Sequence, residues 1–134
     1  MSVLSFPYQI LHGHPSPMPI CDVILLGPRG RTSVRALVDS GAVYSVFPMK
    51  AAEDAGIILM GGQRMSLQYG GSTEPGMKVS VYLLLSGRRH RADVVFVERL
   101  EFPYGLLGRT GLFAQYNEVC FLERLKTPRV EFRL

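Results

Sequence analysis

One short segment of the chain carries a carboxylate in a setting that suits acid–base chemistry. An apolar run at residues 36–38 leads directly into Asp39, and the chain then turns through Ser40, Gly41 and Ala42. Such a turn exposes the carboxylate at the end of a strand, beside a small hydroxyl group that can bond to the nearby backbone. An exposed carboxylate can exchange protons with a reacting group. The same residues also fit an ordinary Asx or Ser turn that closes a strand, so this segment alone leaves both interpretations open.

Two further segments follow this motif in a particular order. Residues 70–76 are rich in glycine and lie on a predicted hairpin. Residues 106–109, Leu-Leu-Gly-Arg, lead into a short pattern that is typical of a helix. The three segments together resemble the retropepsin-like aspartic proteases, with a catalytic Asp-Ser/Thr-Gly-Ala, a flap hairpin, and an apolar-apolar-Gly-Arg segment before a C-terminal helix. The resemblance covers about residues 20–132, and the added helix at residues 48–55 is similar to the cellular and bacterial single-domain members.

The resemblance implies that water attacks a peptide bond while held between two aspartates. Like charges about 3 Å apart cannot both ionise, so the pair shares one proton and titrates as a unit. The ionised oxygen takes a proton from the water, and the protonated partner polarises the scissile carbonyl. Because the chain has one Asp-Ser-Gly motif, the second Asp39 must come from another copy across a two-fold axis. We therefore expect a homodimeric aspartic endopeptidase that acts on a peptide or protein and needs no metal or other cofactor.

The resemblance also implies roles for the residues around Asp39. Ser40 would join the two active-site loops across the axis, Gly41 would offer its backbone to substrate, and Ala42 would complete the loop. The residues expected at the tip of the flap, which opens to admit a peptide and closes to exclude water, are Tyr69, Gly70, Gly71 and Ser72. The segment expected under the active-site loop, where the glycine permits close packing, is Leu106, Leu107, Gly108 and Arg109. The candidates for lining substrate pockets, apart from the flap, are Val46, Met49 and Leu106.

One position departs from the family pattern. Viral members usually carry an acidic residue directly after the alanine of the motif, and this residue pairs with the arginine of the Gly-Arg segment. Here that position is Val43, so Arg109 must find another partner, for which Glu53, Asp54, Glu98 and a backbone carbonyl are candidates.

The remaining sequence predicts the strands that position these segments. Two runs at residues 20–26 and 32–38 flank a Gly-Pro-Arg-Gly turn and predict a hairpin. Residues 48–55 begin at a proline and are followed by Gly56, which is typical of a short helix. Other strands are expected at residues 6–12, 64–69, 77–85, 91–97, 119–122 and 130–134, with a loop at 70–76 and a helical turn or two near 112–116. The fold class expected is a mostly β, closed retropepsin-like barrel with one or two short helices. We expect a single domain over residues 1–134, with the flap at about 64–85 and a C-terminal helix and hairpin at about 111–134.

The composition narrows the class of protein. The chain has 134 residues, 47% of them hydrophobic, and a net charge of +4. No run approaches the roughly 18–20 apolar residues that span a bilayer, and the first residues do not form a secretory signal, so a cytoplasmic protein without a membrane anchor is expected. Cys21 and Cys120 fit no metal-binding spacing and are interpreted as buried thiols. His12 and His14 form only a weak candidate metal site, and no bound metal is expected.

Two other functions remain as alternatives to the protease. The first is a non-catalytic retropepsin-like module for dimerisation or peptide binding, since a fold does not by itself fix a function. The second is a basic, nucleic-acid-binding β-barrel, suggested by residues 88–91, Arg-Arg-His-Arg. No aromatic residue interleaves with that cluster, so we interpret it as a solvated hairpin turn and regard nucleic acid as an unlikely partner.

Overall fold

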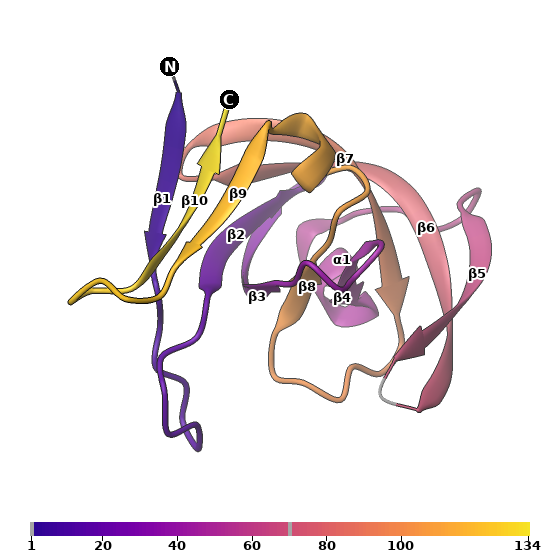
Figure 1. Cartoon of the computed structure of the whole chain (residues 1–134). Helices are drawn as coiled ribbons and strands as arrows, with labels where there is room; N and C mark the ends of the chain where they lie inside the picture. Colours follow the sequence, from indigo (N-terminus) through magenta and orange to yellow (C-terminus); the bar gives the residue numbers. More distant parts are fainter. Residues whose placement is uncertain (1, 70) are drawn as a thin grey trace.

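Strands make up most of the computed structural model, which describes residues 2–69 and 71–134, with Tyr69 described by its backbone alone. Six of them form a closed barrel in the order β2 (Ile20–Leu26), β3 (Arg31–Val38), β8 (Gly105–Leu107), β4 (Ser45–Pro48), β7 (Arg88–Val97) and β6 (Ser72–Leu85). Antiparallel pairing between β2 and β6, from Val23 opposite Leu85 to Leu26 opposite Tyr82, closes the ring. The remaining strand of this sheet, β5 (Gln63–Tyr69), pairs with the first half of β6 and extends away from the barrel (Figure 1). The expected mostly β, closed barrel is confirmed.

A separate three-stranded sheet brings the two ends of the chain together. β1 (Val3–Pro7) pairs with β10 (Arg129–Arg133), which also pairs with β9 (Glu118–Leu122). Figure 1 shows both termini at the same end of this sheet, on the opposite side of the molecule from the β5–β6 hairpin. We call β1, β10 and β9 the terminal sheet.

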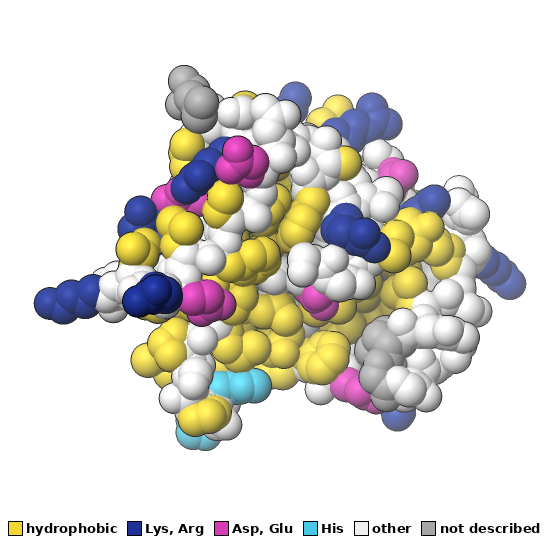
Figure 2. All heavy atoms as spheres, viewed as in Figure 1, with side chains coloured by type: hydrophobic (Ala, Val, Ile, Leu, Met, Phe, Trp, Pro, Cys, Tyr) yellow, Lys and Arg dark blue, Asp and Glu magenta, His cyan; other side chains and the backbone are white. Residues whose placement is uncertain are grey.

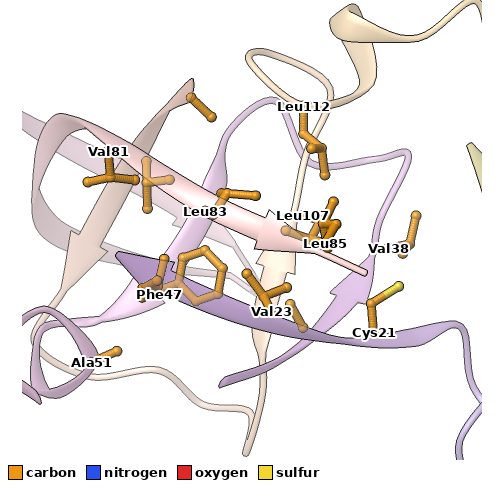
Figure 3. Close-up of a cluster of buried hydrophobic side chains, with 14 of the residues drawn as sticks. Cys21, Val23, Val38, Phe47, Ala51, Val81, Leu83, Leu85, Leu107 and Leu112 are labelled. Atoms are coloured by element: carbon orange, nitrogen blue, oxygen red, sulfur yellow. The ribbon is translucent and has the colours of Figure 1, made fainter. Parts of the chain in front are cut away.

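The barrel is filled by apolar side chains from all its strands. Figure 3 shows Val23, Leu83, Leu85 and Leu107 meeting in the interior, with Phe47 beside them. These five side chains are fully buried. Alternation along the strands explains this packing, because every second residue of β2 and of the second half of β6 points inward. Each such side chain contributes roughly 1.5–3 kcal/mol through its removal from water.

The helix α1 (Met49–Ala55) covers one part of this core. It begins after Pro48, whose backbone is extended, and ends at Gly56, whose φ of 71° is favourable for glycine. Its buried alanines face the barrel. Small side chains allow the turn between β2 and β3 to approach closely, since a Cβ on Gly27 would collide with the Ala55 carbonyl. The hairpin of β2 and β3 and this helix both match the sequence prediction.

Two predictions about the chain's course are wrong. The first strand spans Val3–Pro7 and not residues 6–12, because its position is set by pairing with the distant β10. Residues 72–76, expected in a glycine-rich loop, belong to β6 and pair with β5 in register. Near residues 112–116 the helical segment is a single 3-10 turn, η1 (Phe113–Gln115). No helix among the described residues has the length and apolar character needed to cross a membrane.

Candidate active site

Asp39 lies directly beyond the end of β3. Its backbone N–H donates a hydrogen bond to the Leu107 carbonyl at 3.0 Å, continuing the parallel pairing of β3 with β8 past the last strand residue. The residue is half-buried, whereas Ser40 and Gly41 are exposed. The strand therefore delivers the carboxylate to one end of the barrel, next to backbone that remains open to solvent.

The loop itself orients one carboxylate oxygen. Asp39 Oδ1 accepts a hydrogen bond from the Gly41 N–H at 2.9 Å, and the Ala42 N–H donates to the Asp39 carbonyl at 3.2 Å. This is an Asx turn, so the motif does close a strand in the ordinary structural way, and a role in chemistry is compatible with that. Within the described residues no other donor contacts the carboxylate, which leaves Oδ2 available to a ligand.

Residues 39–44, here called the Asp39 loop, cross beyond the end of β8. The chain leaves β3 on one side of β8 and returns as β4 on the other, because β8 lies between these two strands in the sheet. The chain after β8 then bonds to the loop: the Arg109 N–H donates to the Ala42 carbonyl at 3.0 Å, and the Thr110 N–H donates to the Val43 carbonyl at 2.7 Å. Main-chain hydrogen bonds from the segment after β8 thus fix the loop, and these bonds depend little on side-chain type.

Gly108 makes this close approach possible. A Cβ built on it would lie 2.5 Å from the Tyr44 carbonyl carbon and 3.0 Å from the Ala42 carbonyl oxygen. Both neighbours are backbone atoms of the Asp39 loop and cannot rotate away. The Gly108 N–H donates to the hydroxyl of Ser45 at 3.0 Å, and Ser45 is fully buried.

Ser45 is a residue of the site that the sequence analysis missed. Its hydroxyl accepts a hydrogen bond from the buried Gly108 N–H and so helps to fix the position of the Gly108 segment relative to the Asp39 loop. The available signal is one small polar residue at the start of an otherwise apolar strand, directly after the motif. That signal is weak by itself, because serine is common at strand ends.

The β5–β6 hairpin contains the residues for which the sequence predicts a flap. Tyr69 pairs with Ser72, so only two residues connect the strands, and Gly71 has a φ of 78°. Gly70, one of the residues expected at the tip, and the side chain of Tyr69 lie outside the described part of the chain. The Ser72 hydroxyl donates to Glu101 Oε1 at 3.2 Å, which connects the hairpin end to the loop before β8.

A second apolar cluster joins the Asp39 loop to this hairpin. Val46 and Leu106, two of the expected pocket residues, are buried in it, and Ala42 and Leu67 pack against it. Phe102 and Tyr104 stack with their ring centroids 5.3 Å apart at its margin. Figure 2 shows hydrophobic side chains gathered across the middle of one face of the molecule. Met49, the third expected pocket residue, instead lines a pocket of about 460 Å³ with Met65, Met77 and Glu98.

The comparisons with known proteins follow the same segments. A family model described as aspartyl protease matches residues 26–110, which include both the Asp39 motif and the Gly108 segment. The chain belongs to the aspartyl protease family. The crystal structure of a retropepsin-like aspartic protease from Rickettsia conorii superimposes with a TM-score of 0.68 at 10% identity, over 98% of this chain and 99% of that one. This likeness shows a shared retropepsin-like fold. No curated protein sequence matches the chain at a significant level.

Arg109 differs from the expectation for a member of the aspartyl protease family. Its side chain is exposed, and within the described residues its guanidinium makes no ion pair or hydrogen bond. Asp54, one of the proposed partners, pairs instead with Lys50 at 2.5 Å. Val43, at the position where viral members are acidic, is 48% exposed. The Arg109 main chain fixes the Asp39 loop, and its side chain is free to meet a ligand or another chain.

The cysteines and histidines lie outside this site. Cys21 is fully buried and desolvation, reinforced by the Asp22 charge, raises its pKa to about 12, so its thiol is neutral and unreactive. Burial and the hydrogen bond to Glu118 also raise the pKa of Cys120, which is only half-buried. Across residues 2–69 and 71–134, no group of three or more His, Cys, Asp or Glu side chains is arranged to hold a metal ion.

Proposed function

We propose that this aspartyl protease family member is an aspartic endopeptidase whose active site forms between two copies of the chain. The observation that carries the proposal is the placement of Asp39 at a loop whose Ser40 and Gly41 are exposed. One carboxylate oxygen is fixed by Gly41, and the other has no partner among the described residues. One copy supplies one such carboxylate. A two-fold axis beside the exposed residues of the loop would bring a second carboxylate to face the first.

The chemistry follows from that pairing. Two facing carboxylates share one proton, because the second negative charge is strongly disfavoured beside the first. A water molecule between them loses a proton to the ionised oxygen as it attacks the substrate carbonyl, and the protonated carboxyl donates to the carbonyl oxygen. When the tetrahedral intermediate collapses, the carboxyl that took the proton from water passes it to the leaving amine, and a hydroxyl of the intermediate returns a proton to the other carboxylate. The peptide bond thus breaks without a covalent enzyme intermediate.

The substrate would lie between the Asp39 loop and the β5–β6 hairpin. The second apolar cluster supplies Val46 and Leu106 on the barrel side, and Leu67 supplies an apolar group on the hairpin side. An extended peptide can pair with exposed backbone on both sides, as an added strand does. The site therefore favours a peptide with apolar side chains near the cleaved bond.

The decisive experiment is digestion of a peptide library by the unmodified protein and by Asp39→Asn. We expect cleavage by the first and none by the second. Asp22→Asn, at an exposed aspartate outside the motif, is the matched control that keeps its activity. Mixing unmodified and Asp39→Asn chains then tests the shared site, because activity should fall as the square of the unmodified fraction. Cleavage that persists in Asp39→Asn would exclude this mechanism, and a linear fall would exclude the shared site.

A non-catalytic peptide-binding module is the second candidate, and one observation favours it. Val43 provides no carboxylate, and the Arg109 side chain is without an acidic partner in the described chain. A site built this way lacks one polar contact that would orient a substrate backbone. Peptide binding to the unmodified protein without any product would support this candidate over the protease.

A further inference from the structure

A cleft separate from the proposed active site lies at the other end of β3 from Asp39. It has a volume of about 690 Å³, within the range of ligand-binding sites. Its lining includes Leu26, Arg31, Ile58, Ser80, Tyr82 and Arg89. We call it the distal cleft, because the eight residues of β3 separate Arg31 from Asp39 by roughly 26 Å at 3.3 Å per residue. The proposed protease mechanism uses none of these residues.

The distal cleft opens beside a strand edge with no partner. β6 pairs with β5 as far as Lys78 and with β2 from Tyr82 onward. Between these points residues 79–81 pair with β7 alone, and no backbone hydrogen bond from another described segment reaches them. Ser80 and Val81 both line the cleft. Residues 79–81 can therefore pair with a short extended stretch of a peptide, whose ends must leave the edge where β5 and β2 begin.

The walls of the cleft combine apolar and cationic groups. Ile58 is 71% exposed and Tyr82 is 40% exposed, so both offer apolar surface to a molecule in the cleft. Arg31 and Arg89 are exposed, and neither forms an ion pair with an acidic group among the described residues. None of the residues that line the cleft is acidic. A molecule that carries negative charge as well as apolar surface would complement these walls.

Arg89 and Arg91 both lie against the ring of Tyr82. The Arg89 guanidinium lies 4.5 Å from the centroid of the Tyr82 ring, and the Arg91 guanidinium lies 5.9 Å from it. Arg91 also donates to the Ser80 hydroxyl at 3.0 Å. An aromatic residue of the neighbouring strand β6, Tyr82, thus does accompany the basic cluster at residues 88–91. The expectation that the cluster forms a solvated turn is wrong, because it begins β7. Since the arginines already cover the Tyr82 ring, stacking of a nucleic-acid base on it is disfavoured.

We propose that the distal cleft binds an extended, acidic segment of a partner protein. The segment would pair with the free edge of β6, place apolar side chains against Leu26 and Ile58, and place carboxylates near Arg31 and Arg89. The Arg89 guanidinium is already positioned by Tyr82, and guanidinium groups, which are only weakly hydrated, bind carboxylates well. This proposal does not depend on catalysis at Asp39.

The test uses a fluorescein-labelled hexapeptide of alternating glutamate and leucine, with fluorescence anisotropy as the readout. Binding is measured to the unmodified protein and to Asp39→Asn, in which cleavage of the probe is not expected. We expect equal affinity in the two proteins. The uncharged peptide of alternating glutamine and leucine should bind at least tenfold more weakly. Failure of the protease proposal would leave these results unchanged, so the two proposals are tested separately.

The charge-matched variants locate the binding. Arg31→Gln/Arg89→Gln should lower the affinity at least tenfold, while Arg124→Gln/Lys126→Gln, which removes the same charge from the exposed β9–β10 turn, should change it less than twofold. Bound peptide should also slow hydrogen exchange at residues 79–81. Ile58→Ser, at an exposed position that folding does not require, should weaken binding while leaving the melting temperature unchanged.

Several outcomes would overturn the proposal. Equal losses in the two double variants would show general attraction to a basic protein, and equal binding of the glutamine peptide would remove the role of the arginines. Absence of binding by the glutamate peptide would exclude the proposed occupant. Tighter binding of a single-stranded oligothymidylate that is lost in Arg31→Gln/Arg89→Gln would assign the cleft to nucleic acid instead.

Discussion

The Asp39 loop and the terminal sheet are held to the same barrel by different kinds of contact. The loop is fixed by backbone groups, through the bonds from Asp39, Arg109 and Thr110 and the close approach of Gly108. The terminal sheet is fixed by side chains, above all by Phe132, whose ring meets Phe6, Phe113 and Tyr116 at centroid distances of 5.3–6.1 Å.

Because of this difference, the contacts that position the Asp39 carboxylate are not the ones that contribute most to the free energy of unfolding. Main-chain contacts hold a catalytic group within narrow limits but bury little apolar surface, whereas aromatic packing buries much surface and tolerates small shifts. Changes in the terminal sheet should therefore lower the free energy of unfolding while leaving the geometry at Asp39 unchanged. Changes under the Asp39 loop should alter the site more than their effect on stability indicates.

The largest loss of stability is expected for Phe132→Ala. The side chain is fully buried, and its removal leaves a cavity among three aromatic rings, which costs about 3–5 kcal/mol. Urea unfolding followed by circular dichroism measures the change. Phe132→Leu is the matched control and should cost less than half as much. A loss below about 1 kcal/mol for Phe132→Ala would contradict the assigned role of the aromatic cluster.

Gly108→Ala should come next, at about 2–3 kcal/mol, because the new methyl group would overlap backbone atoms of Tyr44 and Ala42. Peptide cleavage should fall to near background even where the variant is still folded, because the loop must move. Gly30→Ala is the control, since a Cβ there meets its nearest neighbour at an ordinary 3.7 Å. Full activity in a folded Gly108→Ala would show that the close approach of Gly108 does not fix the position of the Asp39 loop.

Ser45→Ala tests the hydrogen bond to the Gly108 N–H separately from the close packing of Gly108 against the loop. The substitution leaves the Gly108 N–H buried without an acceptor, which costs about 1–3 kcal/mol. Ser45→Thr keeps the hydroxyl and should keep more of the activity than Ser45→Ala, although its extra methyl group has to fit a fully buried position. If Ser45→Ala equals the unmodified protein in both unfolding free energy and kcat, the hydroxyl has no positioning role.

These residues also show what sequence can predict. The Asp39 motif, the β2–β3 hairpin and α1 each carry local signals, such as the proline before the helix and the glycine after it. The local signal at Gly76 is misleading, because glycine indicated a loop and the residue lies in β6. A glycine is needed there because a Cβ would come within 3.0 Å of the Phe96 carbonyl oxygen. Ser45 and the position of β1 depend on partners more than 60 residues away in the chain, so no local pattern could reveal them.

The smallest expected effect is a pH dependence at the junction of the terminal sheet with the barrel. His90 is buried, its Nδ1–H donates to the Arg88 carbonyl at 3.0 Å, and its Nε2 accepts a hydrogen bond from the Tyr116 hydroxyl. Burial lowers the pKa of His90 below its usual 6.5, with the Arg88 charge acting in the same direction and the backbone hydrogen bond opposing it.

The unfolded chain therefore binds a proton at His90 more readily than the folded chain does. Stability from this residue is complete above about pH 6.5 and falls as the pH is lowered through that value, until the folded protein is protonated as well. Unfolding free energies measured between pH 5 and 8 should show this slope, and His90→Gln should remove it. Because His90 contacts Tyr116 and not the Asp39 loop, the pH profile of kcat should keep its shape in His90→Gln; a shifted profile would mean that the two regions are coupled after all.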